Sequence, residues 1–343
     1  MSELLVIEDL EVEFRERGAV TNQPLRGITL RVDRGEILGV VGETGCGKSL
    51  TGLAVLGLLP SGAVPSGRVV LDGVEQDLGR PSPHRGDVVS LVFQNPGTAF
   101  NPVFTLGAQM DAVVARHRGR GGGRGMDRKA RRAHILGYLE QVGLPEPERV
   151  YASYPHELSG GMLQRAMIAM ALVCEPKLLI LDEPTTALDV TIAKQILDLV
   201  LELRERFDFG VMLITHNLGV VREICDRVAV LYAGRVIETG ATDEVLSAPA
   251  HPYTRGLLGA LPARHRSGER LEAISGSVPA RLVGVTGCVF APRCPIAVDE
   301  CLAIDPALAP VAAPGAEAPA AAVHAAACIR TAGSGSDMRL EQP

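Results

Sequence analysis

Runs of apolar residues along the chain predict strands that alternate with helices. Period-two alternation in residues 4–14 and 28–33 predicts the start of an antiparallel edge. Longer apolar runs follow, separated by helical patterns such as TIAKQILDLVLELRERF, in the segments EILGVV, DVVSLVFQ, KLLILDEP and GVMLITH. RVAVLYAGRVIETG predicts a hairpin that turns at Ala233 and Gly234. Because strands alternate with helices, we expect a parallel α/β sheet.

Changes in this pattern suggest how the chain is divided. A polar region with helical stretches, punctuated by Pro and Gly, predicts a helical subdomain over about 96–170, inserted in a first domain of residues 1–240. Residues 241–330 form a small irregular extension in this interpretation, because Pro and Gly are frequent there. Within it, residues 306–322 are low in complexity and predict a flexible excursion. We expect the tail, residues 331–343, to be disordered.

Composition and charge narrow the classes of protein that fit. With 343 residues, 46% apolar and 22% charged, the chain has the composition of a globular protein. A formal net charge of −6 argues against general nucleic-acid binding. The basic, glycine-rich run 116–132 could bind RNA or anionic lipid. It has no aromatic residues to stack on bases, however, and we favour a solvated loop before a surface helix.

No export or membrane segment is predicted. The first residues, MSELLVIEDLEVEF, mix acids with apolar positions and do not have the basic start of a signal peptide. No run of eighteen apolar residues occurs, so we do not expect the chain to cross a membrane by itself. Cysteines are sparse outside the last part of the chain, which indicates a reducing compartment.

The segment GETGCGKS fits the phosphate-loop pattern G-x-x-x-x-G-K-[ST]. Gly42, Gly45 and Gly47 allow backbone N–H groups to turn inward around phosphates. Lys48 would reach the β- and γ-phosphates of ATP, and the Ser49 hydroxyl would be a ligand of Mg²⁺. A glycine turn without a ligand is the alternative, but the loop lies between a predicted strand and a predicted helix, as a phosphate loop requires.

Polar residues at the ends of predicted strands support the same chemistry. LLILDE ends in two acids, of which Asp182 would hold Mg²⁺ and Glu183 would polarise the attacking water. Gln94 and His216 end two other apolar runs. Acids can simply end a strand, and a lone histidine is often a core residue. Because ligands bind beyond the carboxyl ends of parallel strands, we instead expect all four side chains to converge on one nucleotide.

The segment ELSGGMLQRAMIAMAL resembles the signature of ABC-type ATPases at Ser159, Gly160 and Gly161, with Gln164 nearby and Leu163 as a small departure. A second phosphate site in one chain makes sense if it serves the ATP of another subunit. The resemblance implies an ABC-type fold: a P-loop NTPase with a RecA-like core, an antiparallel β subdomain and an inserted helical subdomain. It also implies that two such subunits pack head to tail around two nucleotides.

Longer segments narrow the resemblance to importers of dipeptides, oligopeptides and nickel. These segments are LVFQNPGTAFNPVFTLGAQM, YASYPHELSGGM, PTTALDVTIAKQILDL and HPYTRGLLGALP. The resemblance implies that residues 1–240 are the ATP-binding domain and residues 241–330 a transporter extension. It further implies Phe14 as a stack for adenine, Gln94 as the glutamine that senses Mg²⁺ and the permease, and Asp189 as a contact across the dimer. Glu183 would be the catalytic base and His216 the switch at the γ-phosphate.

Four of the seven cysteines lie near the end of the chain, at Cys288, Cys294, Cys301 and Cys328. Their spacing is too wide for the paired C-x2-C arrangement of zinc sites, and it does not match the ferredoxin run. Four thiolates are the right number for a [4Fe–4S] cluster, which members of the resembled family can carry there. Structural zinc, and free or disulfide-linked thiols, remain open alternatives.

The resemblance implies an ATP-hydrolysing subunit, peripheral on the cytoplasmic face of the cell membrane. It would power the import of di- and oligopeptides with ATP, Mg²⁺ and a structural [4Fe–4S] cluster. Its partners would be a second ATPase subunit, which is often a different chain, two membrane permeases and an extracytoplasmic binding protein. Nickel import is the nearest alternative. A soluble ABC protein that acts on DNA or ribosomes fits less well, since the chain has one cassette and no coiled coil.

Overall fold

We describe a computed structural model of the chain over residues 3–117, 126–186, 188–261, 274–311 and 324–330. Three segments interpreted from the sequence lie partly or wholly outside these residues. They are the middle of the basic run 116–132, most of the low-complexity segment 306–322, and the tail 331–343.

A four-stranded antiparallel sheet contains the first strands of the chain. Its order is β2 (Ala19–Asp33), β1 (Glu3–Glu16), β4 (Ala63–Leu71) and β5 (Val74–Glu75). The predicted antiparallel pairing of the first two strands is confirmed. The second strand begins at Ala19, earlier than predicted, and its first half is polar and contains Pro24. An edge strand tolerates both features because one of its sides makes no ladder hydrogen bonds.

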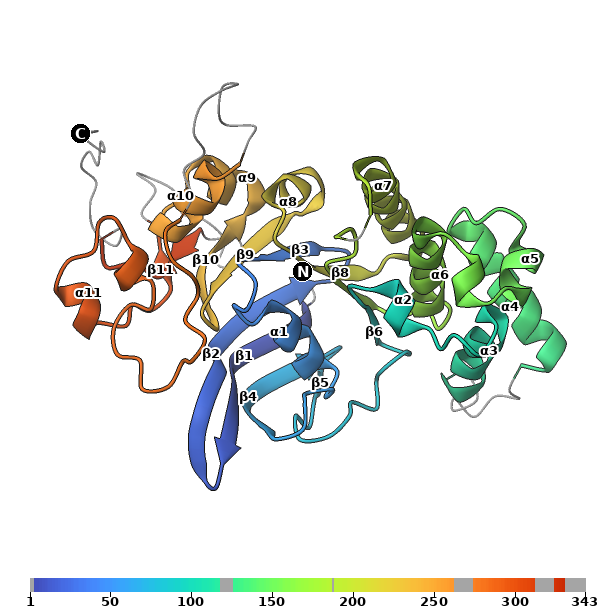
Figure 1. Ribbon diagram of the computed structural model, residues 1–343, viewed down its shortest axis with the longest axis horizontal. Coiled ribbons are helices and arrows are strands. Elements are labelled where there is room, and N and C mark those ends of the chain that lie inside the picture. Colours follow the sequence, from blue (N-terminus) through green and yellow to red (C-terminus); the bar gives the residue numbers. More distant parts are fainter. Residues whose placement is uncertain (1–2, 118–125, 187, 262–273, 312–323, 331–343) are drawn as a thin grey trace.

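A larger sheet forms the centre of the molecule and contains the predicted parallel strands (Figure 1). Parallel pairs join β6 to β7, β7 to β8, β8 to β3 and β3 to β9. Every residue of β3 and β8 is buried, which is why both appear in the sequence as continuous apolar runs. The bounds are β3 (Ile37–Val41), β6 (Val89–Val92), β7 (Leu178–Asp182), β8 (Gly210–Thr215) and β9 (Arg227–Tyr232).

Antiparallel strands complete this sheet on its other side. The predicted hairpin joins β9 to β10 (Arg235–Ala241), and Ala233 and Gly234 both have positive φ, 46° and 78°, as a type I′ turn requires. Two short strands of the extension then add to the edge of the sheet. The strand β12 (Ala325–Ala326) pairs with β10, and β11 (Ala309–Pro310) pairs with β12. The extension therefore continues the central sheet.

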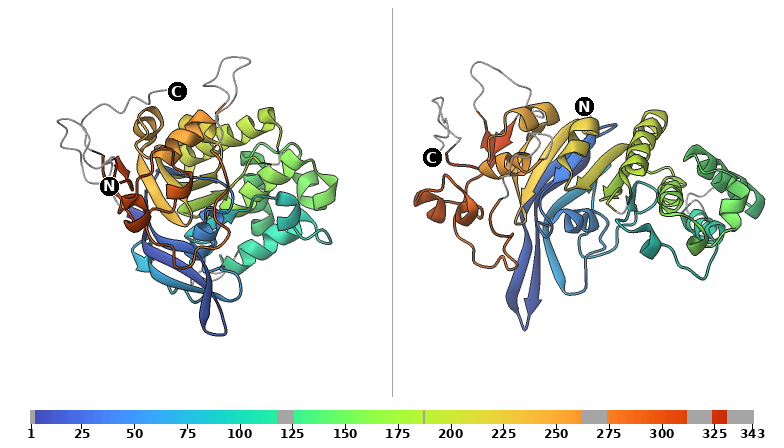
Figure 2. Two further views of the ribbon diagram at one scale, coloured as in Figure 1. Left: turned by 60° about the vertical axis from the view of Figure 1, so that its left-hand side comes forward. Right: turned by 45° about the horizontal axis from the view of Figure 1, so that its top comes forward.

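The helices fall into three groups (Figures 1 and 2). Around the central sheet lie α1 (Lys48–Val55), α7 (Val190–Phe207), α8 (Leu218–Ile224), α9 (Thr242–Ser247) and α10 (Pro252–Gly259). A helical region at one end contains α2 (Pro96–Ala99), α3 (Leu106–His117), α4 (Arg128–Gln141), α5 (Pro147–Ala152), the 3-10 turn Pro155–Glu157 and α6 (Gly160–Leu172). The extension, with the 3-10 turn Ala291–Arg293 and α11 (Glu300–Ala303), lies at the opposite end. In the part of the chain that the structure describes, no helix combines the length and apolarity needed to cross a bilayer.

The central sheet separates two hydrophobic cores and thereby fixes the loops at its strand ends. Along β3, Ile37 and Val41 face one core, whereas Leu38 and Val40 face the other, which the antiparallel sheet covers. This alternation follows from the period of two along a strand. Each such fully buried side chain contributes about 1.5–3 kcal/mol relative to exposure. The strand that enters the glycine loop is therefore held on both faces.

Candidate ATP site

The glycine loop links β3 to α1, as the sequence predicts. Gly42 and Gly47 have φ of 155° and 105°, and both need the absence of a side chain. A Cβ on Gly42 would lie 2.2 Å from the carbonyl oxygen of Leu231, and one on Gly47 would lie 2.6 Å from the Leu25 side chain. Gly45 has φ of 86° and open space around it, so its requirement is conformational only.

Lys48 is the first residue of α1, and its side chain returns across the loop. The side chain is buried, and its Nζ donates to the carbonyl oxygens of Gly42, at 2.8 Å, and Glu43, at 3.0 Å. These bonds hold an ammonium group inside the loop at the positive end of a helix. The arrangement is typical of a site for a polyanion.

Ser49 and Asp182 come together although 133 positions separate them. The Ser49 hydroxyl donates to Asp182 Oδ1 at 2.9 Å, so the start of α1 meets the end of β7. Burial raises the pKa of Asp182, an effect that the Ser49 hydrogen bond partly opposes and the Glu183 carboxylate reinforces. A hydroxyl and a carboxylate at this edge supply the oxygen ligands that Mg²⁺ prefers.

Three side chains converge on Glu183: Gln94 follows β6, His216 follows β8, and Thr186 belongs to the same loop as Glu183. Gln94 Nε2 and Thr186 Oγ1 each donate to Glu183 Oε2 at 2.9 Å, and His216 Nδ1 lies 3.3 Å from Oε1. Burial alone would raise the pKa of Glu183. The hydrogen bonds of Thr186 and His216, together with the charge of Lys48, bring it below its ordinary value. Glu183 also has φ of 46°, a conformation that a non-glycine residue rarely adopts.

The expected convergence of Gln94, Asp182, Glu183 and His216 is therefore present in the geometry. Thr186 was not predicted, although its hydroxyl donates to the same Glu183 oxygen as Gln94. The sequence feature that could have indicated Thr186 is the pair of threonines that directly follows the two acids and Pro184. A hydroxyl three residues after a carboxylate in a tight turn is well placed to donate back to it.

The signature residues lie at the start of another helix. Ser159 caps α6, with its side chain accepting from the Met162 N–H at 3.4 Å, and Gly160 and Gly161 form the first turn. Gln164 follows on the inner side and is buried, and within the part of the chain that the structure describes its Nε2 has no hydrogen-bond partner. This helix belongs to the helical region and lies apart from α1 (Figure 1). The signature and the glycine loop are thus separate sites on one chain.

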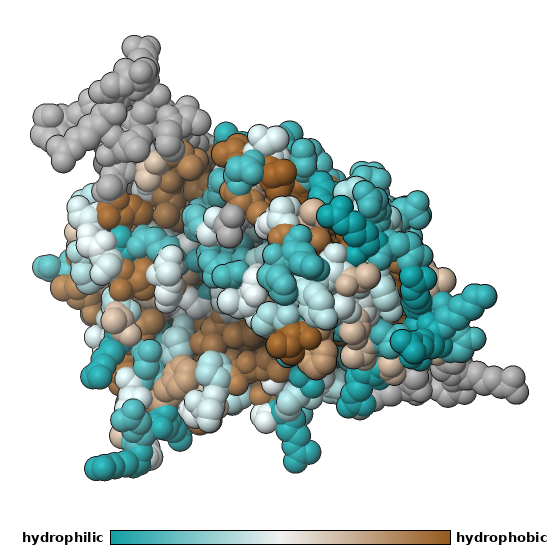
Figure 3. All heavy atoms as spheres, turned by 45° about the vertical axis from the view of Figure 1, so that its right-hand side comes forward, coloured by the Kyte–Doolittle hydropathy of each residue, from teal (hydrophilic) through white to brown (hydrophobic). Residues whose placement is uncertain are grey.

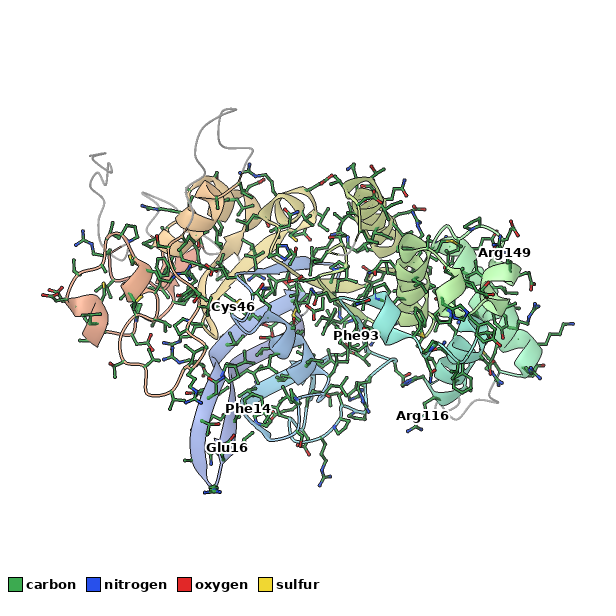
Figure 4. All side chains as sticks on the ribbon, in the orientation of Figure 1. Phe14, Glu16, Cys46, Phe93, Arg116 and Arg149 are labelled. Atoms are coloured by element: carbon green, nitrogen blue, oxygen red, sulfur yellow. The ribbon has the colours of Figure 1, made fainter. Side chains whose placement is uncertain are left out.

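Two further predicted residues have local roles that the structure shows. Asp189 caps α7, and its carboxylate accepts from the N–H groups of Thr191 and Ile192 at 3.1 and 3.0 Å. Phe14 lies on β1, partly buried against the core under the antiparallel sheet. Figure 4 labels it on the long hairpin, and Cys46 in the glycine loop. The dimer contact of Asp189 and the adenine stack of Phe14 stay predictions.

The four late cysteines line one small cavity, together with residues such as Pro252 and Ile296. All seven cysteines lie in the described residues, and none forms a disulfide, so the disulfide alternative is not seen. Within the described ranges, no group of three or more His, Cys, Asp or Glu side chains is arranged to hold a metal ion. Burial raises the pKa of both Cys288 and Cys294, and the neighbouring thiols add to this effect.

Comparison with known families gives two matches along the chain. The family described as "ABC transporter" matches residues 25–186. The family described as "Oligopeptide/dipeptide transporter, C-terminal region" matches residues 237–301, which begin in β10 and end at Cys301.

Full-length relatives are similar over most of the chain. The probable peptide ABC transporter ATP-binding protein y4tR of Sinorhizobium fredii is 44% identical, over 96% of this chain and 95% of the relative. The dipeptide transport ATP-binding protein DppD of Escherichia coli is 43% identical, over 89% and 92%. Among solved structures, cbiO1 of Clostridium perfringens has a TM-score of 0.58 at 27% identity, over 72% of this chain and 92% of that one. A dimeric cassette, MJ0796, bound to ADP and Pi has the same TM-score and identity, over 69% and 98%.

Proposed function

The chain belongs to the family of ABC transporter ATP-binding subunits, and from this we propose that it hydrolyses ATP to power the import of di- and oligopeptides. The relatives named above carry peptide or dipeptide transport in their names, and the C-terminal match is to peptide transporters. The observation that carries the hydrolytic part is the arrangement at Glu183. One ionised carboxylate is held by three donors beside a phosphate loop.

We assign the roles at the nucleotide as follows. Lys48 exchanges its two loop carbonyls for the β- and γ-phosphate oxygens, and the loop N–H groups hold the same phosphates. Ser49, Gln94 and Asp182 are the residues that would hold Mg²⁺, which supplies charge neutralisation at the phosphates. Glu183 accepts a hydrogen bond from the attacking water, and its lowered pKa keeps it ionised for that purpose. His216 senses the γ-phosphate.

The second half of the site would come from a partner ATPase subunit, often a different chain. Ser159, Gly160 and Gly161 face the partner's nucleotide in this proposal, and Asp189 contacts the partner. Gln164 was predicted to join them, but it is buried behind the first turn of α6 and does not face outward. Val190, beside Asp189, is 86% exposed, which is unusual for a large apolar residue and fits a surface that a second subunit covers. The dimeric form of the MJ0796 cassette supports this arrangement.

Two membrane permeases would bind near Gln94. Phe93, Val103 and Phe104 are 44%, 69% and 54% exposed, just before Gln94 and between α2 and α3. In Figure 3 hydrophobic side chains gather in the lower middle of the view, and the right-hand end is mainly hydrophilic. Exposed apolar patches of this kind mark interaction surfaces. We place the subunit at the cytoplasmic side of the membrane, with an extracytoplasmic protein delivering the peptide.

We further propose that the four late cysteines hold a [4Fe–4S] cluster. The four thiols line one cavity, and their number and type match the donor set of such a cluster. A bound cluster would add a cross-link between the segments that carry Cys288, Cys294, Cys301 and Cys328.

The test is peptide uptake in cells that lack the chain, with rescue by wild type, Glu183→Gln and the matched surface variant Glu205→Gln. We expect Glu183→Gln to lower ATP turnover by about 100-fold or more, because general-base contributions have that size. Uptake of labelled di- and oligopeptides should fall with it, whereas Glu205→Gln should behave as wild type. Unchanged turnover in Glu183→Gln would contradict the catalytic assignment. Loss of nickel uptake alone would contradict the peptide assignment.

A further inference from the structure

The second residue of the glycine loop, Glu43, is held by two residues that lie far away in the sequence. Tyr253 and Arg293 follow it by 210 and 250 positions. Tyr253 belongs to α10, and Arg293 ends the 3-10 turn Ala291–Arg293 of the extension. The roles assigned above to the nucleotide site do not use either residue.

Tyr253 holds the backbone of the loop. The N–H of Glu43 donates to the Tyr253 hydroxyl oxygen at 2.9 Å. The tyrosine is completely buried, and its ring centre lies 4.7 Å from that of Tyr232 and 5.4 Å from that of Phe290. Aromatic residues make up only 3% of the chain, so three of them packed together here form a rigid support for one backbone N–H.

Arg293 holds the side chain of the same residue. Its Nη1 donates to Glu43 Oε2 at 3.1 Å and to the Tyr232 hydroxyl at 3.3 Å. The remaining donors bond the carbonyl oxygens of Ile274, Ser275 and Gly276, at 3.4, 2.7 and 3.3 Å. The arginine side chain is only 8% exposed, and among the described residues the other Glu43 oxygen has no hydrogen-bond partner. The half-buried Glu43 carboxylate therefore has Arg293 as its ion-pair partner.

The segment that carries Arg293 also carries the cysteines. Arg293 directly precedes Cys294, and Cys288 lies at the other end of the same turn, with its N–H donating to the Cys301 carbonyl at 2.7 Å. The Arg293 guanidinium also lies over the Tyr232 and Phe290 rings, 5.7 and 6.0 Å from their centres. A change in the fold of this cysteine loop would therefore move the group that holds Glu43.

We propose that Tyr253 and Arg293 are positioning residues for nucleotide binding, through which the extension holds the phosphate loop in its binding conformation. Tyr253 binds the backbone N–H of Glu43, and Arg293 binds its carboxylate. Lys48 donates to the carbonyl of this same residue, so a displaced Glu43 also displaces the phosphate-binding ammonium. The conformation of the cysteine loop thereby sets the affinity of the cassette for MgATP. The inference depends on the proposed binding of ATP at this loop.

The experiment measures the Kd of a fluorescent ATP analogue with Mg²⁺ for the full chain and for Tyr253→Phe, Arg293→Gln and Glu43→Gln. Tyr253→Phe keeps the buried ring and removes only the acceptor oxygen. Arg281→Gln changes an exposed arginine of the same extension and is the matched control. We expect Kd to rise about fivefold or more in the first three variants, as typical coupling between sites would give, and to be unchanged in Arg281→Gln. Amide exchange at residues 42–48 should become faster in Tyr253→Phe.

A double variant, Glu43→Gln with Arg293→Gln, separates positioning from general damage. If Arg293 acts through Glu43, the increases in Kd caused by the two substitutions will not add. The double variant will then have the same Kd as the single variant with the higher Kd. Additive effects, or a Kd in Tyr253→Phe and Arg293→Gln equal to wild type, would overturn the inference. Lys48→Ala tests the underlying assignment separately: if it binds as wild type does, the ATP site itself is wrong.

Discussion

At the scale of single residues, the two adjacent acids at the end of β7 have opposite environments. Glu183 accepts hydrogen bonds that lower its pKa, so its contribution to stability is present above its unfolded pKa and is lost as pH falls through its folded value. Asp182 has its pKa raised by burial, so it contributes stability at low pH that is lost as pH rises from its unfolded to its folded value. At this strand end the protein thus stabilises the ionised form of Glu183 and destabilises the ionised form of Asp182.

Asp182→Asn is expected to stabilise the protein without nucleotide and to abolish its ATP hydrolysis. The amide can still accept from Ser49 but has no buried charge, and relief of such a strained site adds about 0.5–2 kcal/mol to the free energy of unfolding at neutral pH. Urea unfolding at several pH values checks this, and the difference from wild type should shrink toward acid pH. A variant that is less stable at neutral pH would show that Asp182 is not a destabilised carboxylate.

At the scale of elements, Asp189 is observed to cap α7 and is predicted to contact the partner subunit across the dimer. Two substitutions can separate these two roles. Asp189→Ala removes the acceptor for two N–H groups and should lower the free energy of unfolding by about 1 kcal/mol, whereas Asp189→Asn keeps an acceptor and should cost little. If the carboxylate also contacts the partner, ATP turnover should fall in both variants. Full turnover in Asp189→Asn would leave only the capping role.

Strands buried on both faces could be predicted from the sequence, and the largely exposed strand β4 could not. The strands β3, β7 and β8 appear as apolar runs because burial on both faces requires it, and the polar residues that follow them stand out. The strand β4 was not predicted, since Pro65 and Gly67 weaken its pattern and much of it is exposed. No local pattern could place Arg293 beside Glu43, because that contact depends on how the extension packs.

At the scale of the whole molecule, the extension is a region whose order we attribute to its cysteines. Cys294→Ser should lower iron and acid-labile sulfide in anaerobically prepared protein to background and should make the extension more sensitive to protease, because a cross-link is lost. Cys174→Ser, at a buried thiol outside the extension, is the control for iron content. Wild-type protein that contains neither iron nor sulfide would contradict the cluster proposal.

The pairing of β12 on β10 joins the predicted first domain to the extension. The sequence suggested a boundary after residue 240, but a chain cut there would leave β10 as a bare sheet edge open to pairing with other chains. The cut would also leave the fully buried carboxylate of Glu238 without its partners. This carboxylate accepts from the N–H groups of Ala250 and His251 and pairs with His324 at 2.7 Å. We therefore expect a chain cut after residue 240 to aggregate and to leave the Glu238 carboxylate without its partners.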